Sequence, residues 1–238
     1  MSANFPVNPK SWRRPELRSD EVTKTLKRLL ERITERFPGS GLSKVCADVI
    51  EISKDSREVA AWILKPILPL RIAIAAFMLV VSFALFYSIS RLHLSIANLS
   101  VQDLVNVLNS ATNEIILLTA GVFSLVTIET RIKRARVVDA ISNLRAVAHI
   151  IDMHQLSKAP GSSTHGLSDE LLARYLDYCS EMLSLVSKIA FLYVNNFDDG
   201  DANQSVNELE DLTSGLSRKI WQKITIILDQ NKTVNLQK

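Results

Sequence analysis

Three polar residues with helical spacing, Arg145, His149 and Asp152, are the combination in this sequence best suited to chemistry. Intervals of four and three residues place all three on one face of a helix. An aspartate can orient an imidazole, so the set could serve acid–base catalysis or help to bind a metal. Both roles need groups from a second segment, and no nucleophile or ligand cluster is evident elsewhere. The pattern favours an ion pair within the helix or a polar seam between helices, with a membrane-tethered enzyme as an alternative.

Two further groups of acidic residues are candidates for a cation-binding or pore-lining site. Asp198, Asp199 and Asp201 superficially suggest a calcium loop, but Gly200 comes too early for the EF-hand pattern, which predicts a solvated turn instead. Glu114 and Glu129 bracket an apolar segment, where ionisable groups are candidates for function. Glu114 with Asn113 could line the mouth of an oligomeric pore, whereas Glu129 has basic neighbours with which it can pair.

The elements that would position these residues are organised around Ile72–Ser90, nineteen residues without a charge. As a helix this segment is about 28 Å long, close to the roughly 30 Å hydrocarbon core of a bilayer. Lys65, Arg71 and Arg91 flank it, as expected of residues at a membrane interface. The sequence therefore predicts a first transmembrane helix over residues 70–91.

A second transmembrane helix is predicted over residues 111–129, although only Ile115–Ile128 is free of charge and Glu114 lies at its edge. The basic residues precede the first span and follow the second, while the connection over 92–110 has only Arg91 beside it. The positive-inside rule then places both termini in the cytosol and the connection outside. The residues assigned to lipid headgroups and topology are Arg71, Arg131, Lys133, Arg134 and Arg136.

Amphipathic helices are predicted on both sides of the spans. Residues 1–18 are irregular, and residues 19–65 form a cytosolic helix hairpin that Ser19 caps and Pro38-Gly39 divides into 19–37 and 42–64. Such a hairpin cannot bury both apolar stripes alone, and we expect it to pack on the C-terminal domain. Residues 130–238 form a cytosolic three-helix bundle, with helices over 131–157, from a Ser168 cap, and from about Ser205 past Leu228. Residues 100–109 form a short amphipathic helix on the outer membrane surface or, alternatively, the first turns of a long second span.

Composition narrows the class of protein. Glycine and proline are scarce, with seven of each among 238 residues, which favours helices over a turn-rich sheet. The net charge of +3 is too small to indicate nucleic-acid binding. Cys46 and Cys179 lie far apart, match no metal-binding or redox spacing and fit a reducing compartment. No cofactor, metal site or catalytic residue is predicted, and we expect a protein that is not an enzyme.

The segment from Glu129 to Lys158 resembles a juxtamembrane helix of small bacterial two-span inner-membrane proteins; its sequence is ETRIKRARVVDAISNLRAVAHIIDMHQLSK. The resemblance extends over this segment and the preceding span. It implies a bacterial inner-membrane setting and supplies no activity.

The sequence therefore predicts an all-α protein: a two-helix transmembrane hairpin with a cytosolic helical bundle. The expected partners are the lipid bilayer, further copies of the chain and a cytosolic protein, and no nucleic acid. The first functional hypothesis is a non-enzymatic anchor, scaffold or sensor that couples a helical interaction domain to the membrane. The alternatives are an oligomeric channel or membrane-disrupting effector, for example in bacterial defence, and the membrane-tethered enzyme.

Overall fold

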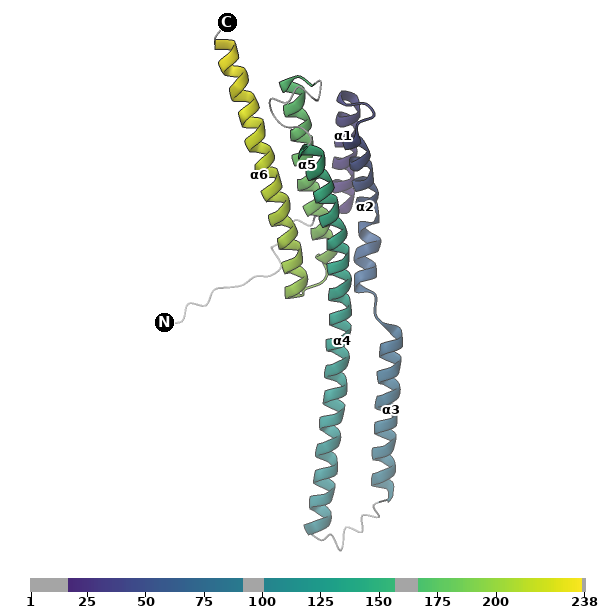
Figure 1. Cartoon of the computed structure of the whole chain (residues 1–238). Helices are drawn as coiled ribbons and strands as arrows, with labels where there is room; N and C mark the ends of the chain where they lie inside the picture. Colours follow the sequence, from purple (N-terminus) through teal and green to yellow (C-terminus); the bar gives the residue numbers. More distant parts are fainter. Residues whose placement is uncertain (1–16, 92–100, 157–166, 237–238) are drawn as a thin grey trace, which may run out of the picture. The chain divides into compact units, whose positions relative to one another are not determined.

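A computed structural model describes residues 17–91, 101–156 and 167–236 of the chain, and in these residues the fold is all-α, with no strand. The predicted fold class is confirmed at this level. The helices are α1 (Ser19–Arg36), α2 (Gly41–Leu64), α3 (Leu68–Arg91), α4 (Val101–Leu156), α5 (Asp169–Val194) and α6 (Gly200–Leu236) (Figure 1).

The chain divides into two compact units. The bundle unit comprises residues 1–62 and 138–238, and the hairpin unit comprises residues 63–137. Helix α4 contributes its first part to the hairpin unit and its last part to the bundle unit. Each unit is described by itself below.

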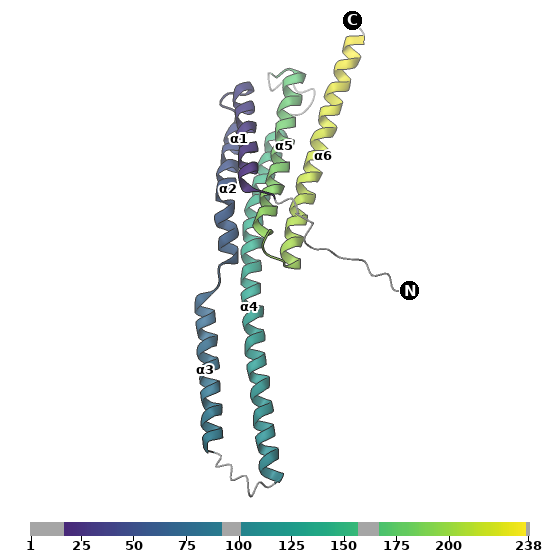
Figure 2. The same ribbon diagram turned by 180° about the vertical axis from the view of Figure 1, so that it is seen from behind.

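Helix α5 is the central helix of the bundle unit, because it packs against both α6 and α1 (Figure 2). Its apolar residues are buried on several sides, among them Leu176, Met182 and Ile189. At the end of α1, the Phe37 ring packs edge-on against Tyr175 and Tyr178 of α5. Helix α1 of the predicted hairpin therefore packs against α5, one of the C-terminal helices.

The helix ends of the bundle follow local sequence signals in part. Gly39 has φ of +69°, a left-handed conformation that glycine adopts easily, and it lies in the turn between α1 and α2. The Ser168 hydroxyl accepts a hydrogen bond from Leu171 N–H at 3.3 Å and caps α5 as predicted. The predicted Ser19 cap is wrong: Ser19 is already helical, and the N-cap residue is Arg18, whose side chain makes no capping hydrogen bond.

Helix α6 begins about five residues earlier than predicted. The Asp199 carboxylate accepts a hydrogen bond from Ala202 N–H at 3.0 Å, and Asp199 is buried. The acidic segment is therefore in part a helix cap, and the interpretation as a wholly solvated turn is wrong.

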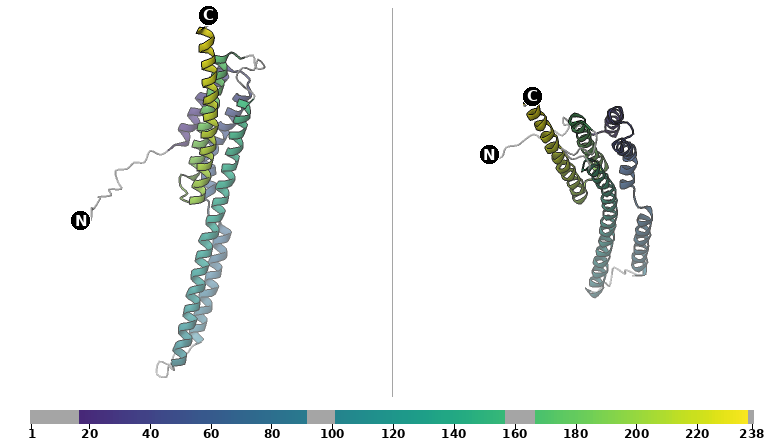
Figure 3. Two further views of the ribbon diagram at one scale, coloured as in Figure 1. Left: turned by 60° about the vertical axis from the view of Figure 1, so that its left-hand side comes forward. Right: turned by 45° about the horizontal axis from the view of Figure 1, so that its top comes forward.

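In the hairpin unit, α3 and the first part of α4 run antiparallel, side by side (Figure 3). Near one end Arg71 pairs with Glu129 and Arg136 donates to the Lys65 carbonyl; farther along, Phe77 lies against Gly121. Residues 65–67 interrupt the helices before α3, and Pro69 occupies the first turn of α3, where its missing N–H costs little. Helix α4 starts at Val101, so residues 101–109 are the first turns of a long helix, and the separate surface helix is wrong. Residues 92–100 lie outside the described residues.

Candidate functional site

Among the predicted site residues, Glu129 makes the most hydrogen bonds and ion pairs in the described part of the chain. Its carboxylate accepts two hydrogen bonds from the Arg71 guanidinium, from Nε at 3.0 Å and Nη2 at 2.9 Å, and pairs with Lys133 Nζ at 2.8 Å. The Glu129 side chain is only 10% exposed, whereas that of Arg71 is 52% exposed. A bidentate ion pair of this kind fixes the relative orientation of the two side chains, and it joins α3 to α4 at one end of the hairpin.

The remaining predicted basic residues lie close to this pair along the chain. Arg136 donates a hydrogen bond to the Lys65 carbonyl oxygen at 3.0 Å, Arg134 is half-buried and Arg131 is exposed. We name the six cations at this end of the hairpin unit the basic collar: Lys65, Arg71, Arg131, Lys133, Arg134 and Arg136. Glu129 is the carboxylate that pairs with two of them.

Glu114 differs from Glu129 in its surroundings. One of its carboxylate oxygens, Oε1, is buried and has no hydrogen-bond partner among the described residues. The neighbouring Asn113 is exposed, and the Thr112 hydroxyl donates to the Leu108 carbonyl at 2.8 Å within α4. A buried carboxylate oxygen without a partner destabilises the fold unless a proton, cation or further chain satisfies it.

The stripe Arg145, His149 and Asp152 does not converge on one point. Arg145 Nη2 pairs with Glu208 of α6 at 3.2 Å, and the Asp152 carboxylate accepts a hydrogen bond from Gln155 Nε2. His149 is exposed. Of these residues, Arg145 therefore pairs between helices, whereas the Asp152 hydrogen bond lies within α4.

Gln155 and Lys223 form a second polar contact between α4 and α6, which was not predicted. Gln155 is buried, and its Oε1 accepts a hydrogen bond from Lys223 Nζ of α6 at 2.6 Å. The pairing joins residues 68 positions apart, so helical spacing gives no signal of it. A polar seam therefore links α4 to α6 through Arg145–Glu208 and Gln155–Lys223.

A second unpredicted contact joins α1 to α5. The Arg32 guanidinium binds the Glu181 carboxylate through two nitrogens and lies 5.4 Å from the centroid of the Tyr178 ring. The hydrogen bonds and charge of Glu181 raise the pKa of Arg32, although burial opposes this shift. Lysine would not replace this arginine, because a single ammonium group cannot bind a carboxylate through two nitrogens.

A cavity of about 370 Å³, open to solvent, lies between α1 and α2. Four cations, three hydroxyls and one carboxylate line it: Lys24, Lys27, Lys54, Arg57, Ser19, Thr23, Ser53 and Asp20. The alternation of charged and apolar residues in each helix was interpreted only as an amphipathic pattern, which does not show that two basic faces meet.

Both cysteines are buried and reduced in the bundle unit. Burial raises the pKa of the Cys46 and Cys179 thiols to about 12, so they remain protonated at neutral pH. These two thiols therefore have the surroundings of structural rather than reactive cysteines.

Comparison of the chain with protein-family models, curated proteins and solved structures found no match.

Proposed function

We propose that this chain is an integral membrane protein in which α3 and the first part of α4 cross the bilayer as a hairpin. In this proposal the bundle unit is a cytosolic interaction domain, and the protein acts as a non-enzymatic anchor, scaffold or sensor. The proposal includes the bacterial inner-membrane setting that the resemblance of the juxtamembrane segment implies.

The observation that carries this proposal is the exposure of large apolar side chains on the hairpin unit. Leu79, Phe83 and Phe123 are each at least 70% exposed. Two helices in the described residues are long and apolar enough to cross a membrane by length and composition, with mean hydropathies of 2.3 and 1.7. An apolar surface of this kind is unfavourable in water and favourable in lipid.

The basic collar supports the proposed topology. Its six cations lie at one end of the hairpin unit, next to the bundle unit in sequence. Because lysine and arginine are retained on the cytosolic side, this end and both termini are assigned to the cytosol. Arg71 and Glu129 would then pair at the headgroup level, where water and lipid phosphates reduce the energetic cost of charge.

Cell fractionation and reporter fusions test this proposal. We expect the full chain to sediment with membranes, to resist carbonate extraction and to require detergent for release. Reporters fused to either terminus should indicate the cytosol, and a reporter inserted between residues 92 and 100 should indicate the opposite side. Release without detergent, or termini on opposite sides, would contradict the proposal.

An oligomeric channel or membrane-disrupting effector is the second candidate, and Glu114 is the observation that favours it. In a transmembrane hairpin, the unpartnered Oε1 of Glu114 would be satisfied by a permeating cation, a proton or another copy of the chain. We expect any cation flux through reconstituted liposomes to fall in Glu114→Gln but not in Asn113→Ala, whose side chain is exposed. A flux that is absent from the parent chain, or unchanged in Glu114→Gln, would remove this candidate.

A further inference from the structure

We propose that the cavity between α1 and α2 is a binding site for a phosphate group. The site lies wholly within the bundle unit; binding of a soluble phosphate does not depend on the proposed membrane function, whereas a lipid headgroup as its ligand rests on that function. Its ligand chemistry is the anionic oxygens of a phosphate group, carried either by a lipid headgroup or by a soluble phosphate ester.

Four cations, two from each helix, surround the cavity. Lys24 and Lys27 are three residues apart on α1, and Lys54 and Arg57 are three residues apart on α2. This spacing places each pair on one helix face, so two cationic pairs line a single cavity. Like charges held together repel one another, and a bound anion would remove that repulsion.

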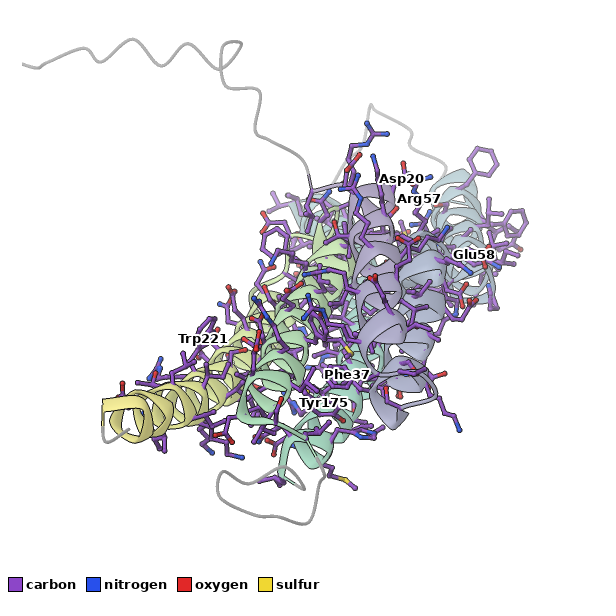
Figure 4. All side chains as sticks on the ribbon, turned by 90° about the horizontal axis from the view of Figure 1, so that it is seen from above. Asp20, Phe37, Arg57, Glu58, Tyr175 and Trp221 are labelled. Carbon is purple, nitrogen blue, oxygen red and sulfur yellow. The ribbon has the colours of Figure 1, made fainter. Side chains whose placement is uncertain are left out.

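Carboxylates of the protein already pair with two of these four cations, Lys54 and Arg57. Asp20 lies on the cavity wall and pairs with Arg57 at 2.7 Å and with Arg18 at 3.3 Å. Lys54 pairs with Glu51 on its own helix at 2.7 Å. In Figure 4, Asp20 and Arg57 lie together where α1 and α2 meet, and Glu58 lies nearby. No ion pair of Lys24 or Lys27 occurs within the described part of the chain, and both ammonium groups are exposed.

Neutral hydroxyl groups also line the cavity wall. The Thr23 and Ser53 hydroxyls are hydrogen-bonded to each other at 2.7 Å, and the Ser53 side chain is fully buried. Because Ser53 is fully buried, only the Thr23 hydroxyl can reach a ligand in the cavity, and when Ser53 donates to Thr23 the Thr23 hydrogen is available to an oxyanion. Hydroxyls beside several ammonium groups are typical of phosphate sites, since phosphate oxygens accept from both.

The start of α1 adds a further favourable feature. Ser19 and Asp20 of its first turn line the cavity, and the N-cap residue Arg18 provides no side-chain cap. The first N–H groups of a helix and its dipole favour a negative charge at this position. A phosphate in the cavity would therefore meet lysines from two helices and the Thr23 hydroxyl, beside a first turn of α1 that already carries the Asp20 and Glu21 carboxylates.

The position along the chain decides which phosphate sources should be tested. Arg57 precedes Leu68, the first residue of α3, by only eleven residues. Residues 57–64 continue α2 and residues 65–67 lead into α3, so under the proposed membrane function the cavity belongs to the helix that precedes the first span, and a lipid headgroup is one phosphate source to test. A soluble phosphate ester offers the same chemistry without a membrane.

The experiment uses the full chain in neutral detergent, with Lys24→Gln/Lys54→Gln as the test variant. Lys188→Gln/Lys219→Gln, on exposed positions of α5 and α6, is the matched control with the same change in charge. One arm titrates inorganic phosphate by calorimetry, against sodium chloride at equal ionic strength. The other arm counts phosphatidylglycerol and phosphatidylcholine retained from mixed micelles by native mass spectrometry.

We expect saturable binding of phosphate, of phosphatidylglycerol or of both, weakened at least about tenfold in the test variant and less than about twofold in the control. Retention of phosphatidylglycerol alone assigns a lipid headgroup, and binding of phosphate alone assigns a soluble ester. The proposal is overturned if neither ligand exceeds its reference, or if both variants lose binding equally. A chain that fractionates without detergent would contradict the proposed function and leave the phosphate arm fully interpretable.

Discussion

The hairpin unit and the bundle unit contain the same kinds of apolar residue and bury them to opposite extents. Leu176 and Ile189 of the bundle are fully buried, whereas Leu79 and Phe123 of the hairpin are each 72% exposed. In the bundle, α5 has neighbours on several sides, and in the hairpin, α3 and α4 cover each other along one face only. An apolar residue type therefore does not determine burial; the number of neighbouring helices does.

Polar residues differ between the two units in the same way. The bundle uses hydrogen bonds between distant helices, such as Gln155–Lys223 and Arg32–Glu181, to hold helices that also share an apolar core. The hairpin concentrates its charges at one end, where Arg71 and Glu129 join its two helices. Membrane insertion, as proposed above, would account for both the bare apolar surface and the terminal position of these charges.

High pH should produce the largest difference between the units. Burial raises the pKa of Cys46, Cys179 and Tyr193 to about 12, and all three belong to the bundle unit. Below about pH 8 these groups are neutral in both the folded and the unfolded chain; from there to about pH 12 the unfolded chain releases protons first, so stability falls as pH rises.

Tryptophan fluorescence measures this effect in the bundle alone, because all three tryptophans lie outside residues 63–137. We expect the bundle to unfold with a midpoint above pH 9 while helicity from the hairpin persists in detergent. A bundle equally stable at pH 8 and pH 11 would contradict the assigned burial of these groups.

Shortening one core residue should be the next largest effect. Leu176→Ala leaves a cavity in the centre of the bundle and should destabilise it by about 2–5 kcal/mol. The matched change Leu79→Ala, on the exposed face of the hairpin, should cost less than about 1 kcal/mol in detergent. Urea denaturation followed by tryptophan fluorescence measures the first, and helicity measures the second. Equal losses would mean that the two units do not differ in packing.

Removing the Glu129 carboxylate should have an intermediate effect, confined to the hairpin. Glu129→Ala leaves Arg71 and Lys133 side by side without their shared carboxylate, at a cost of about 1–3 kcal/mol. Hydrogen exchange at the first turns of α3 should accelerate by roughly tenfold or more. Arg131→Ala is the control, because Arg131 is exposed, and it should leave exchange unchanged. Acceleration in both variants would mean that the effect does not come from loss of the Glu129 pairs.

The polar stripe of α4 should give the smallest effects. Arg145→Ala loses an exposed pair with Glu208 and should cost at most about 1 kcal/mol, and His149→Ala should change stability by less than about 0.5 kcal/mol. Cellular function should also survive His149→Ala. If His149→Ala abolished cellular function while the bundle stayed folded, the alternative hypothesis of a membrane-tethered enzyme would be supported.

Local sequence signals were sufficient to predict the helices and many of their ends. Helical spacing of apolar residues, the Pro38-Gly39 turn and the Ser168 cap act between neighbours in the chain, so they can be recognised locally. The sequence also located the charges at the ends of the apolar segments, including the Glu129 carboxylate and its basic neighbours. Local signals failed at Ser19 and at residues 101–109, where the helix continues beyond the expected boundary.

Only the tertiary structure decided which helix faces meet. Arg32 pairs with Glu181, which lies 149 positions away in the sequence, and Gln155 is hydrogen-bonded to Lys223, which lies 68 positions away. Two basic helix faces line one cavity, next to the hydrogen bond between Thr23 and Ser53. These contacts depend on how α1, α2, α4, α5 and α6 pack, and packing is set by the shape of whole apolar faces rather than by residue spacing within one helix. The stripe of Arg145, His149 and Asp152 illustrates this limit, because its spacing is compatible with chemistry and its side chains do not converge on one point.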